Sequence, residues 1–247
     1  LSITRKDFTL HNWPTALDGF RIAHLTDLHY RPGDDEELIE KVIAAVKKEA
    51  PDLILITGDY IIHEYSTFPE LCAKLKELSA PHGIIASPGN HDRWYCSPRY
   101  LSMHLEKIGV SYLQNDGTTL HIKGERIFIP ALDSIWGGHI DPARAWKGHR
   151  KDDPVIALVH EPDVFDQLHQ SRPVSLQLSG HTHGGQCRVP LIGYAPAKVR
   201  YGQNYIYGDF EKNDAQLWVG RGIGTVGLRV RFSCAPEVSI LTMRAPS

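Results

Sequence analysis

Residues 84–92 read Ile-Ile-Ala-Ser-Pro-Gly-Asn-His-Asp, and this stretch decides the fold. A short apolar run that ends in Pro-Gly is typical of a buried strand that stops at a loop. The loop then carries an amide, an imidazole and a carboxylate in succession, at Asn90, His91 and Asp92. The same residue types also populate ordinary turns, so the interpretation depends on how the other strands end.

Four other apolar runs end in side chains of the same kinds. Residues 20–26 lead to Asp27 and His29, residues 53–56 to Asp59, residues 155–159 to His160, and residues 174–178 to His181 and His183. Segments with helical spacing, 38–46 and 69–78, separate the first three strands. This alternation predicts a parallel sheet, and ligands bind such sheets beyond the carboxyl ends of the strands.

The rest of the chain predicts further elements around this unit. We expect an edge strand or irregular lead-in over 1–16, a helix over 98–107, and strands over 110–113, 118–122 and 127–131 that form a second, more antiparallel set. We also expect a long loop with one helical turn over 133–153, an irregular loop over 186–204, and strands over 205–210, 216–219 and 238–242. No repeat or linker interrupts the chain, so residues 1–247 are predicted to form a single domain.

Composition argues against several classes of protein. The chain has 247 residues and a formal net charge of −2, which argues against a long nucleic-acid footprint. Its four cysteines are far apart and are interpreted as reduced thiols. No apolar run approaches the roughly 20 residues that span a bilayer, and no signal peptide is visible. The chain begins at Leu1 rather than Met, which leaves room for an N-terminal anchor before it.

The polar side chains at the strand ends form a candidate metal site. The set is Asp27, His29, Asp59, Asn90, His160, His181 and His183, with His91 and Asp92 beside it. Imidazole and oxygen donors together suit Zn, Mn or Fe rather than calcium, which prefers oxygen alone. Seven ligands exceed one tetrahedral site and suit two divalent ions that share a carboxylate. Two-metal sites of this kind serve phosphoester hydrolysis, so we expect a phosphohydrolase.

The five motifs resemble those of the calcineurin-like metallophosphoesterases. They are Asp27-x-His29, Gly58-Asp59, Gly89-Asn90-His91-Asp92, His160 and Gly180-His181-Thr182-His183. The resemblance implies an α/β fold, a four-layer αββα sandwich of two mixed sheets, with a dimetal site at the carboxyl ends of the strands. It also implies that one ion is bound by Asp27, His29 and His183, that the other is bound by Asn90, His160 and His181, and that Asp59 bridges both.

The resemblance gives His91 a different role. In the family this position contacts the scissile phosphate or the leaving-group oxygen, and Asp92 is expected to orient the ring and favour its charged form. The two ions are expected to activate a bridging water, so that a metal-bound hydroxide cleaves a phosphodiester or pyrophosphate bond. A protonated His91 then donates a proton to the departing oxygen.

A narrower resemblance, to the YkuE/YaeI branch of small bacterial phosphodiesterases, depends on three further stretches. These are residues 17–22, 181–186 and 221–224, although Cys187 stands where an aliphatic residue is expected. The branch is similar to UDP-2,3-diacylglucosamine pyrophosphohydrolases of lipid A synthesis, and this activity is the alternative function. The resemblance implies a small phosphorylated substrate, lipid- or nucleotide-linked, peripheral membrane contact, and a cytoplasmic or inner-membrane location in a bacterium.

Two other functions remain as alternatives. A non-catalytic scaffold of the same fold usually lacks some ligands, whereas all seven and His91 are present here. A nuclease calls for a capping domain or a basic groove, and neither is visible, so no nucleic-acid partner is expected. The sequence leaves open the identity of the metal, the substrate and the oligomeric state.

Several residues near the motifs have plainer interpretations. We expect His24 to be a core histidine, Cys187 to be a structural thiol, and the glycines at 222, 224 and 227 to form a turn rather than a dinucleotide site. Other residues either border the site or serve packing and solvation: His63, His139, His149, Trp94, Tyr95, Trp136, Arg221, Arg229 and Arg231.

Overall fold

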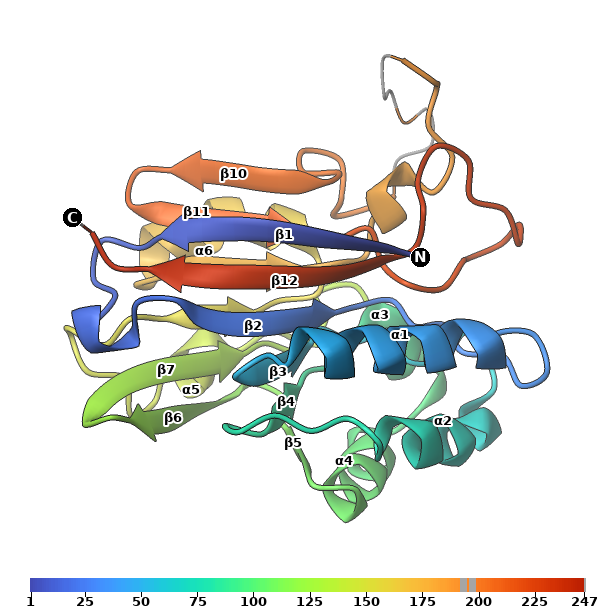
Figure 1. The fold of residues 1–247 in the computed structure, drawn as a ribbon, viewed down its shortest axis with the longest axis horizontal. Helices are drawn as coiled ribbons and strands as arrows, with labels where there is room; N and C mark the ends of the chain where they lie inside the picture. Colours follow the sequence, from blue (N-terminus) through green and yellow to red (C-terminus); the bar gives the residue numbers. More distant parts are fainter. Residues whose placement is uncertain (192–194, 196–198, 247) are drawn as a thin grey trace.

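Burial on both faces of the strands explains why the chain forms layers. The structure is a computed structural model that describes residues 1–191, 195 and 199–246. Successive side chains of a strand point to opposite faces, so an apolar strand needs a partner layer on each side. On β2 (Phe20–Leu25), Ile22 lies in the core between two sheets, whereas Ala23 and Leu25 lie in the core under helices. The predicted four-layer αββα sandwich is thereby confirmed (Figure 1).

The first sheet has the strand order β1-β12-β2-β3-β4-β5. Its other members are β1 (Ser2–Thr9), β3 (Leu53–Ile56), β4 (Ile84–Ala86), β5 (Val110–Tyr112) and β12 (Glu237–Arg244). Strands β2 to β5 are parallel, while β12 is antiparallel to β2 and parallel to β1. The expected strand near residue 110 therefore belongs to this sheet and not to the second set.

The second sheet has the order β10-β11-β9-β8-β7-β6. Its strands are β6 (Asp116–Ile122), β7 (Glu125–Ala131), β8 (Ile156–Leu158), β9 (Leu176–Ser179), β10 (Gly208–Lys212) and β11 (Ala215–Val219). The outer pairs β6-β7 and β10-β11 are antiparallel, but the four inner strands are parallel. The expected antiparallel pairing is confirmed for 118–122 and 127–131, which are β6 and β7. The sheet as a whole is mixed, because the long segments after β7 and β8 make crossovers and not hairpins.

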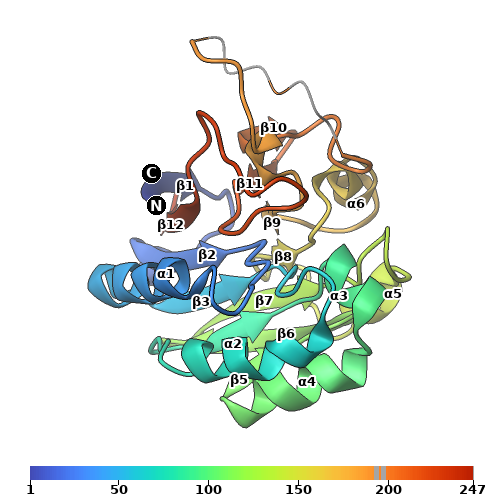
Figure 2. The same ribbon diagram turned by 90° about the vertical axis from the view of Figure 1, so that its right-hand side faces the viewer.

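Helices cover the outer face of each sheet. The first sheet is covered by α1 (Glu36–Glu49), α2 (Phe68–Leu75) and α4 (Pro98–Lys107), and the second by α5 (Pro142–Ala145) and α6 (Phe165–Ser171) (Figure 2). Apolar spacing predicted α1, α2 and α4, but not α6 or the short α3 (Asn90–Tyr95). Residues 90–92, which the sequence predicts to lie in a loop after β4, therefore form the first turn of α3. Among the described residues, no helix is long and apolar enough to cross a bilayer.

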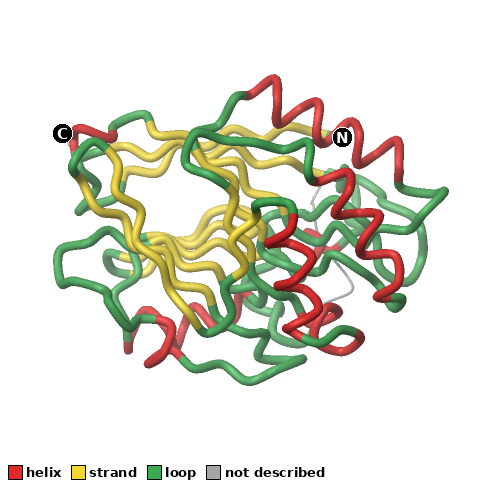
Figure 3. Tube along the Cα trace, turned by 90° about the horizontal axis from the view of Figure 1, so that it is seen from below, coloured by secondary structure: helices red, strands yellow, loops and turns green. Residues whose placement is uncertain are grey.

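Short 3-10 turns and loops complete the chain. The turns are η1 (Thr15–Leu17), η2 (Tyr65–Thr67), η3 (Pro162–Val164) and η4 (His183–Gly185). The irregular loop expected over 186–204 includes residues 192–194 and 196–198, which lie outside the described residues. Figure 3 shows the strands of both sheets running towards a common group of loops. The backbone N–H of His181 after β9 bonds to the Asp27 carboxylate after β2, so the two sheets meet there.

Candidate metal centre

Five strand ends place buried polar side chains around one point. Asp27 and His29 follow β2, Asp59 follows β3, Asn90 begins the helix after β4, His160 follows β8, and His181 and His183 follow β9. The strands are parallel within each sheet, so their carboxyl ends lie at the same edge. The structure therefore brings together all seven side chains that the sequence singles out as ligands.

The Asp59 carboxylate lies between two histidines from opposite sheets. Its Oδ2 atom is 3.3 Å from Nε2 of His29 and 3.2 Å from Nε2 of His160. Its Oδ1 atom accepts a hydrogen bond of 2.8 Å from the backbone N–H of His91. That bond fixes the carboxylate and leaves Oδ2 towards the two rings, which is the arrangement expected of a bridging ligand.

The remaining ligand atoms fall into two groups. Potential donor atoms of Asp27, His29 and His183 lie within 4.8 Å of one another, and so do those of Asp59, His160 and His181. Within the first group, Nε2 of His183 is 3.4 Å from Oδ1 of Asp27. The first group is the set that the family resemblance implies for one ion, and the second contains His160 and His181 of the other set together with Asp59. A third group joins His91 to His29 and Asp59, so the His91 ring also lies within reach of the centre.

Three of these donor atoms are buried and, within the described residues, have no hydrogen-bond partner. They are Nε2 of His29, Nε2 of His160 and Oδ1 of Asn90. Buried polar atoms are normally paired, because leaving one unpaired costs about 1–3 kcal/mol. A divalent cation would satisfy all three at once, so these residues fit a bound metal.

In three of the histidine rings one nitrogen is hydrogen-bonded to a backbone carbonyl, which leaves the other nitrogen available to a metal ion. Nδ1 of His29 is 3.1 Å from the carbonyl of Ile61, and Nδ1 of His160 is 2.6 Å from the carbonyl of Thr57. A neutral ring that donates to a carbonyl keeps a lone pair on its other nitrogen, and backbone carbonyls commonly orient metal-binding histidines in this way. His181 is held through Nε2, 2.7 Å from a backbone carbonyl in the loop after η4, so Nδ1 is its available atom.

His183 is the exception among the four rings. Its Nδ1 atom faces the guanidinium of Arg231 at 3.2 Å rather than a carbonyl. Arg231 is half-buried and also donates to the carbonyls of Gly224 and Arg221. The arginine thus links the loop after β11 to the ring that follows β9, a contact that no local sequence pattern indicates.

The charges around Asp59 favour a cation. Burial would raise the pKa of Asp59, but the His160 and His29 rings hold that pKa well below its usual value. Burial lowers the pKa of His181 to about 4, and the nearby His160 contributes. Burial also lowers the pKa of His183 well below its usual value. Burial would lower the pKa of His160 as well, but the Asp59 carboxylate holds that pKa well above its usual value. The carboxylate is therefore ionised and paired with a charged ring, and a metal ion that binds there would displace the proton of His160.

Backbone conformation is unusual at the same residues. Asp27, His29, Asp59, His181 and His183 all have positive φ angles, between 42° and 71°. Residues other than glycine rarely adopt this conformation, and strained residues of this kind cluster at functional sites. Five of the seven candidate ligands therefore have this strained backbone conformation.

Glycines allow the strand ends to approach one another closely. A Cβ atom on Gly180 would lie 1.9 Å from Oγ1 of Thr26 and 2.2 Å from Oδ2 of Asp27. A Cβ atom on Gly58, whose φ is +84°, would lie 2.1 Å from the backbone N of Gly89. These distances explain why glycine precedes both His181 and Asp59 in the sequence.

We expect Gly180→Ala to lower the free energy of unfolding by about 3 kcal/mol or more, because the new methyl group clashes with Thr26 and Asp27. Urea denaturation measures the loss. Gly124→Ala is the control, since Gly124 has positive φ but open space around its Cβ position, and it should lose only about 1 kcal/mol. Equal losses in both variants would show that the close approach does not matter.

Asp92 differs from the expectation that it orients the His91 ring. Its carboxylate instead accepts hydrogen bonds from the backbone N–H groups of Asp59, Tyr60 and Gly89, at 2.7, 2.9 and 2.9 Å. Burial, with Asp59 nearby, raises its pKa to about 7. Asp92 sits at the third position of α3, where a carboxylate readily caps free N–H groups. It therefore holds the loop after β3 against the start of the helix.

The His91 ring is oriented by a backbone carbonyl. Its Nδ1 atom is 2.8 Å from the carbonyl of Ile62, so Nε2 is the free nitrogen. The expectation that Asp92 favours the charged ring is also not met, because burial lowers the pKa of His91. Asp92 acts on His91 only indirectly, by holding the loop that contains Ile62.

A cavity of about 630 Å³ opens over the centre. Beside the metal-site residues it is lined by Trp94, Tyr95 and Trp136. The ring centroids of His91 and Trp94 are 4.9 Å apart, and those of Trp94 and Trp136 are 4.7 Å apart. The loop aromatic residues of the sequence thus form one wall of the cavity, on the side where His91 lies.

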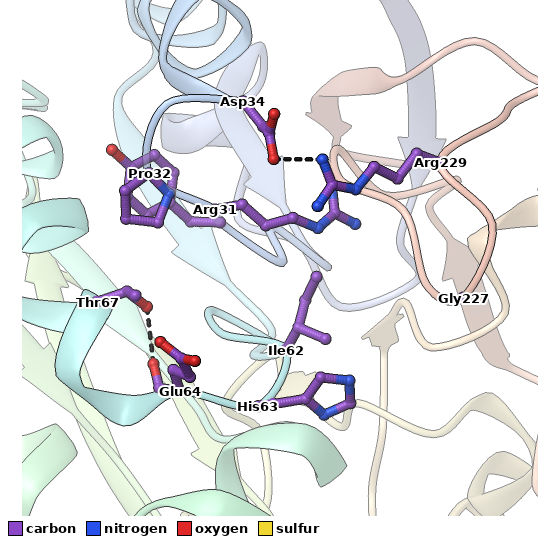
Figure 4. A pocket seen from close by; sticks show the side chains of 10 residues that line it. Arg31, Pro32, Asp34, Ile62, His63, Glu64, Thr67, Gly227 and Arg229 are labelled. Carbon is purple, nitrogen blue, oxygen red and sulfur yellow. Dashed lines mark hydrogen bonds and ion pairs between the residues drawn. The ribbon is translucent and has the colours of Figure 1, made fainter.

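A second cavity, of about 460 Å³, adjoins the first and shares His63 with it (Figure 4). Arg31 and Arg229 lie along one side, and Arg229 forms an ion pair with Asp34 (Figure 4). Arg31 also donates to the hydroxyl of Thr225 at 2.8 Å. The loop around residues 225–229 therefore borders both cavities.

Sequence reasoning missed Glu161, which is fully buried next to His160. Its carboxylate accepts a hydrogen bond from the Ser134 hydroxyl and bonds of 3.3 and 3.4 Å from the backbone N–H groups of Ile135 and Trp136. It thus holds the loop that carries Trp136 into the cavity wall. A charged residue next to His160, one position beyond the apolar run 155–159, is the signal that would have pointed to it.

The plainer interpretations of nearby residues are confirmed where the structure describes them. His24 is buried, with Nε2 2.8 Å from Oγ1 of Thr57, and burial lowers its pKa to about 3. The Cys187 thiol contacts the carbonyl of Val230. Gly222 and Gly224 pack against Asp27 and the backbone of Leu28, so these glycines serve a close turn and not a nucleotide.

Comparison with known proteins agrees with this geometry. The sequence pattern of the family described as calcineurin-like phosphoesterase matches residues 20–185. The chain is 34% identical to the uncharacterized metallophosphoesterase YkuE of Bacillus subtilis, over 94% of this chain and 82% of the relative. It is 32% identical to the phosphodiesterase YaeI of Escherichia coli, over 91% of this chain and 82% of the relative.

More distant matches share the fold. The chain is 26% identical to the UDP-2,3-diacylglucosamine pyrophosphatase LpxG of Chlamydia trachomatis, over 98% of this chain and 88% of the relative. The solved structure of the NAD nucleotidase of Haemophilus influenzae has a TM-score of 0.54 and 15% identity, covering 83% of this chain and 45% of the nucleotidase. At that identity the similarity concerns the fold alone.

Proposed function

From the finding that the chain belongs to the calcineurin-like phosphoesterase family, we propose that this hydrolase cleaves a phosphodiester or pyrophosphate bond at a two-metal centre. In this proposal Asp27, His29 and His183 hold one divalent ion. Asn90, His160 and His181 hold the other, and Asp59 lies between them. The mixed nitrogen and oxygen donors suit Mn, Zn or Fe.

The observation that carries the proposal is the set of buried, unpaired donor atoms. Nε2 of His29 and Nε2 of His160 lie 3.3 and 3.2 Å from the same oxygen of Asp59, and neither has a hydrogen-bond partner among the described residues. Oδ1 of Asn90 is unpaired and buried in the same way. A non-catalytic scaffold has no need to keep three potential ligand atoms buried and without a hydrogen-bond partner.

Bound divalent ions supply Lewis-acid chemistry, because they neutralise charge on phosphoryl oxygens and activate water. The protein supplies position and a hydrogen bond. Nδ1 of His91 donates to the Ile62 carbonyl, so Nε2 faces the substrate and donates to a phosphate or leaving-group oxygen only when the ring is protonated. His91 lies within reach of Asp59 and His29, so that oxygen would be next to the centre. The negative charge of a bound phosphate would favour that protonated form.

The cavity favours an ester whose phosphate carries a sizeable apolar or aromatic group. Trp94, Tyr95 and Trp136 line the cavity on the side of His91. A free phosphate monoester with a small alcohol would leave this wall uncovered. YaeI, one of the similar proteins, is named as a phosphodiesterase, which agrees with a diester or diphosphate substrate.

Cleavage of UDP-2,3-diacylglucosamine is the alternative substrate assignment. It is supported by the similarity to LpxG, which spans 98% of this chain. That substrate joins a nucleotide to a diacylated sugar through a diphosphate, and its planar base and apolar chains both match the chemistry of the cavity wall.

The purified, metal-loaded protein is expected to hydrolyse bis(p-nitrophenyl) phosphate at least about tenfold faster than p-nitrophenyl phosphate, because the second aryl group covers the aromatic wall. A chelator should abolish both reactions, and added Mn²⁺ should restore them. The same preparation is then tested on UDP-2,3-diacylglucosamine. Full activity in metal-free protein would refute the proposal, and a preference for the monoester would refute the substrate class.

A further inference from the structure

The loop that follows β11 has an inverted pattern of exposure. In Leu228-Arg229-Val230-Arg231-Phe232 the three apolar side chains are 78%, 54% and 55% exposed. Arg231, which lies between two of them, points inwards instead and donates to backbone carbonyls. A loop in water normally buries its apolar residues and exposes its charges. Here Arg231 is inside, while the three apolar side chains lie outside with Arg229.

The loop is held in this arrangement by a neighbouring segment. The backbone N–H of Phe232 bonds to the carbonyl of Gln186, and the N–H of Arg188 bonds back to the carbonyl of Phe232. The Gln186 side chain bonds to the carbonyls of Val226 and Leu228 at 3.0 Å each. Exposure of the apolar residues is therefore built into the structure and does not reflect a loose loop.

Val189 and Leu191 extend the apolar surface onto the second segment, with exposures of 39% and 106%. Together with Leu228, Val230 and Phe232 they form what we call the apolar rim. The rim contains half of the ten large, exposed apolar side chains of the described residues. Both segments leave the same end of the sandwich (Figures 1 and 2). Clustered exposure of this kind marks an interaction site.

Charge indicates what kind of surface the rim contacts. The described parts of 186–208 and 215–236 contain five arginines and no Asp or Glu. Arg221 and Arg231 bond inwards, to Glu237 and to backbone carbonyls, so Arg188, Arg200 and Arg229 are the cations nearest the surface. Arg229 is 64% exposed, and its partner Asp34, from the loop before α1, is 47% exposed, so water weakens that ion pair. Apolar side chains flanked by arginines are typical of proteins that bind an anionic lipid surface.

We propose that the apolar rim docks on an anionic phospholipid bilayer. Leu228, Val230 and Phe232 enter the boundary between headgroups and acyl chains, and Arg229 lies at the level of the headgroups. The same loops border the active-site cavity, through Gln186 and Val226. Docking therefore turns the cavity towards the bilayer. If the proposed hydrolase function holds, a second consequence follows, namely that the substrate is a lipid-linked phosphodiester or diphosphate.

Vesicle binding tests the proposal without requiring catalysis. The full chain is sedimented with vesicles of phosphatidylcholine, with and without phosphatidylglycerol, in the presence of chelator. We expect binding to the anionic vesicles, and a loss of about tenfold or more in the double variant Leu228→Ser/Phe232→Ser. Arg229→Gln should weaken binding only to vesicles that contain phosphatidylglycerol. Because no hydrolysis is measured, a failure of the catalytic proposal leaves this result interpretable.

Met103→Ser is the matched control. Met103 is 42% exposed on α4, on the helical layer of the first sheet, and its replacement should leave vesicle binding unchanged. Thermal unfolding checks that each variant is folded. The proposal is overturned if the wild-type protein does not sediment with anionic vesicles, or if the double variant binds as well as wild type. Concentration-dependent dimerisation that the double variant abolishes, without vesicle binding, would show that the rim contacts a second copy instead.

Discussion

Replacing His91 with alanine is expected to reduce kcat for bis(p-nitrophenyl) phosphate by about 10²- to 10⁴-fold, the range for loss of a side chain that exchanges a proton with a reacting group. Metal content should not change, because the proposal assigns His91 to the substrate oxygen and not to a metal ion. The backbone N–H that holds Asp59 is retained in the variant. Steady-state kinetics and metal analysis of the same preparation give both quantities.

His63→Ala is the matched control for this experiment. The His63 ring lines the same cavity, with its centroid 6.1 Å from that of His91, but it has no role in the proposed chemistry. Its removal should change kcat by less than about tenfold. If His91→Ala loses a metal ion, the division of roles is wrong. His91 would then be a ligand, as its position near His29 and Asp59 also allows.

Asp59→Asn is expected to reduce hydrolysis by more than about 100-fold, because it removes the charge shared by both proposed metal sites. Even the loss of groups that only support a metal ligand commonly costs 10- to 100-fold. The substitution preserves shape and an oxygen that can accept from the His91 N–H, so the loop should keep its conformation. Initial rates at saturating Mn²⁺ measure the effect.

Asp153→Asn is the control for charge removal at a buried carboxylate. Asp153 pairs with Arg126 at 2.9 Å and lines neither cavity. This variant should lose stability and keep its turnover per folded molecule. If Asp153→Asn and Asp59→Asn lose activity to the same extent, the effect of Asp59 would be one of folding and not of metal binding.

The sequence predicted that these side chains would meet, because each proposed ligand lies within a few residues of the end of an apolar strand. Residues 53–56, for example, are apolar without interruption, and Asp59 follows a glycine turn at their end. Strand ends at one edge of a parallel sheet must converge, so the ligand set can be read without knowledge of the loops. Helix α1 could be predicted equally well, because Ile39, Val42 and Val46 repeat with the helical period and are buried as expected.

The directions of the strands in the second sheet could not be predicted from the sequence in the same way. An apolar strand such as β8 has the same appearance whether its neighbour is parallel or antiparallel, and only the connection decides. The helix α6 after β8 is short and largely polar, and its two buried residues, Phe165 and Leu168, are too few to establish a period. Without that helix, the crossover between β8 and β9 was not recognised.

Contacts between distant segments account for the errors within the site. Adjacency in sequence suggested that Asp92 orients His91, whereas the first turn of α3 directs the carboxylate to N–H groups of the loop after β3. The carbonyls of Ile61 and Ile62, which orient His29 and His91, belong to the same loop. Backbone groups have no residue-specific signal, so such partners become visible only in the folded chain.

The most direct test of the account is the metal content of wild-type protein and Asp59→Asn, measured side by side by elemental analysis after loading with Mn²⁺ and removal of free ions. We expect two ions per chain in wild type, few or none in the variant, and hydrolysis that reaches its maximum only as the second ion binds. Two ions bound equally by both proteins, or full hydrolysis by metal-free wild type, would contradict it.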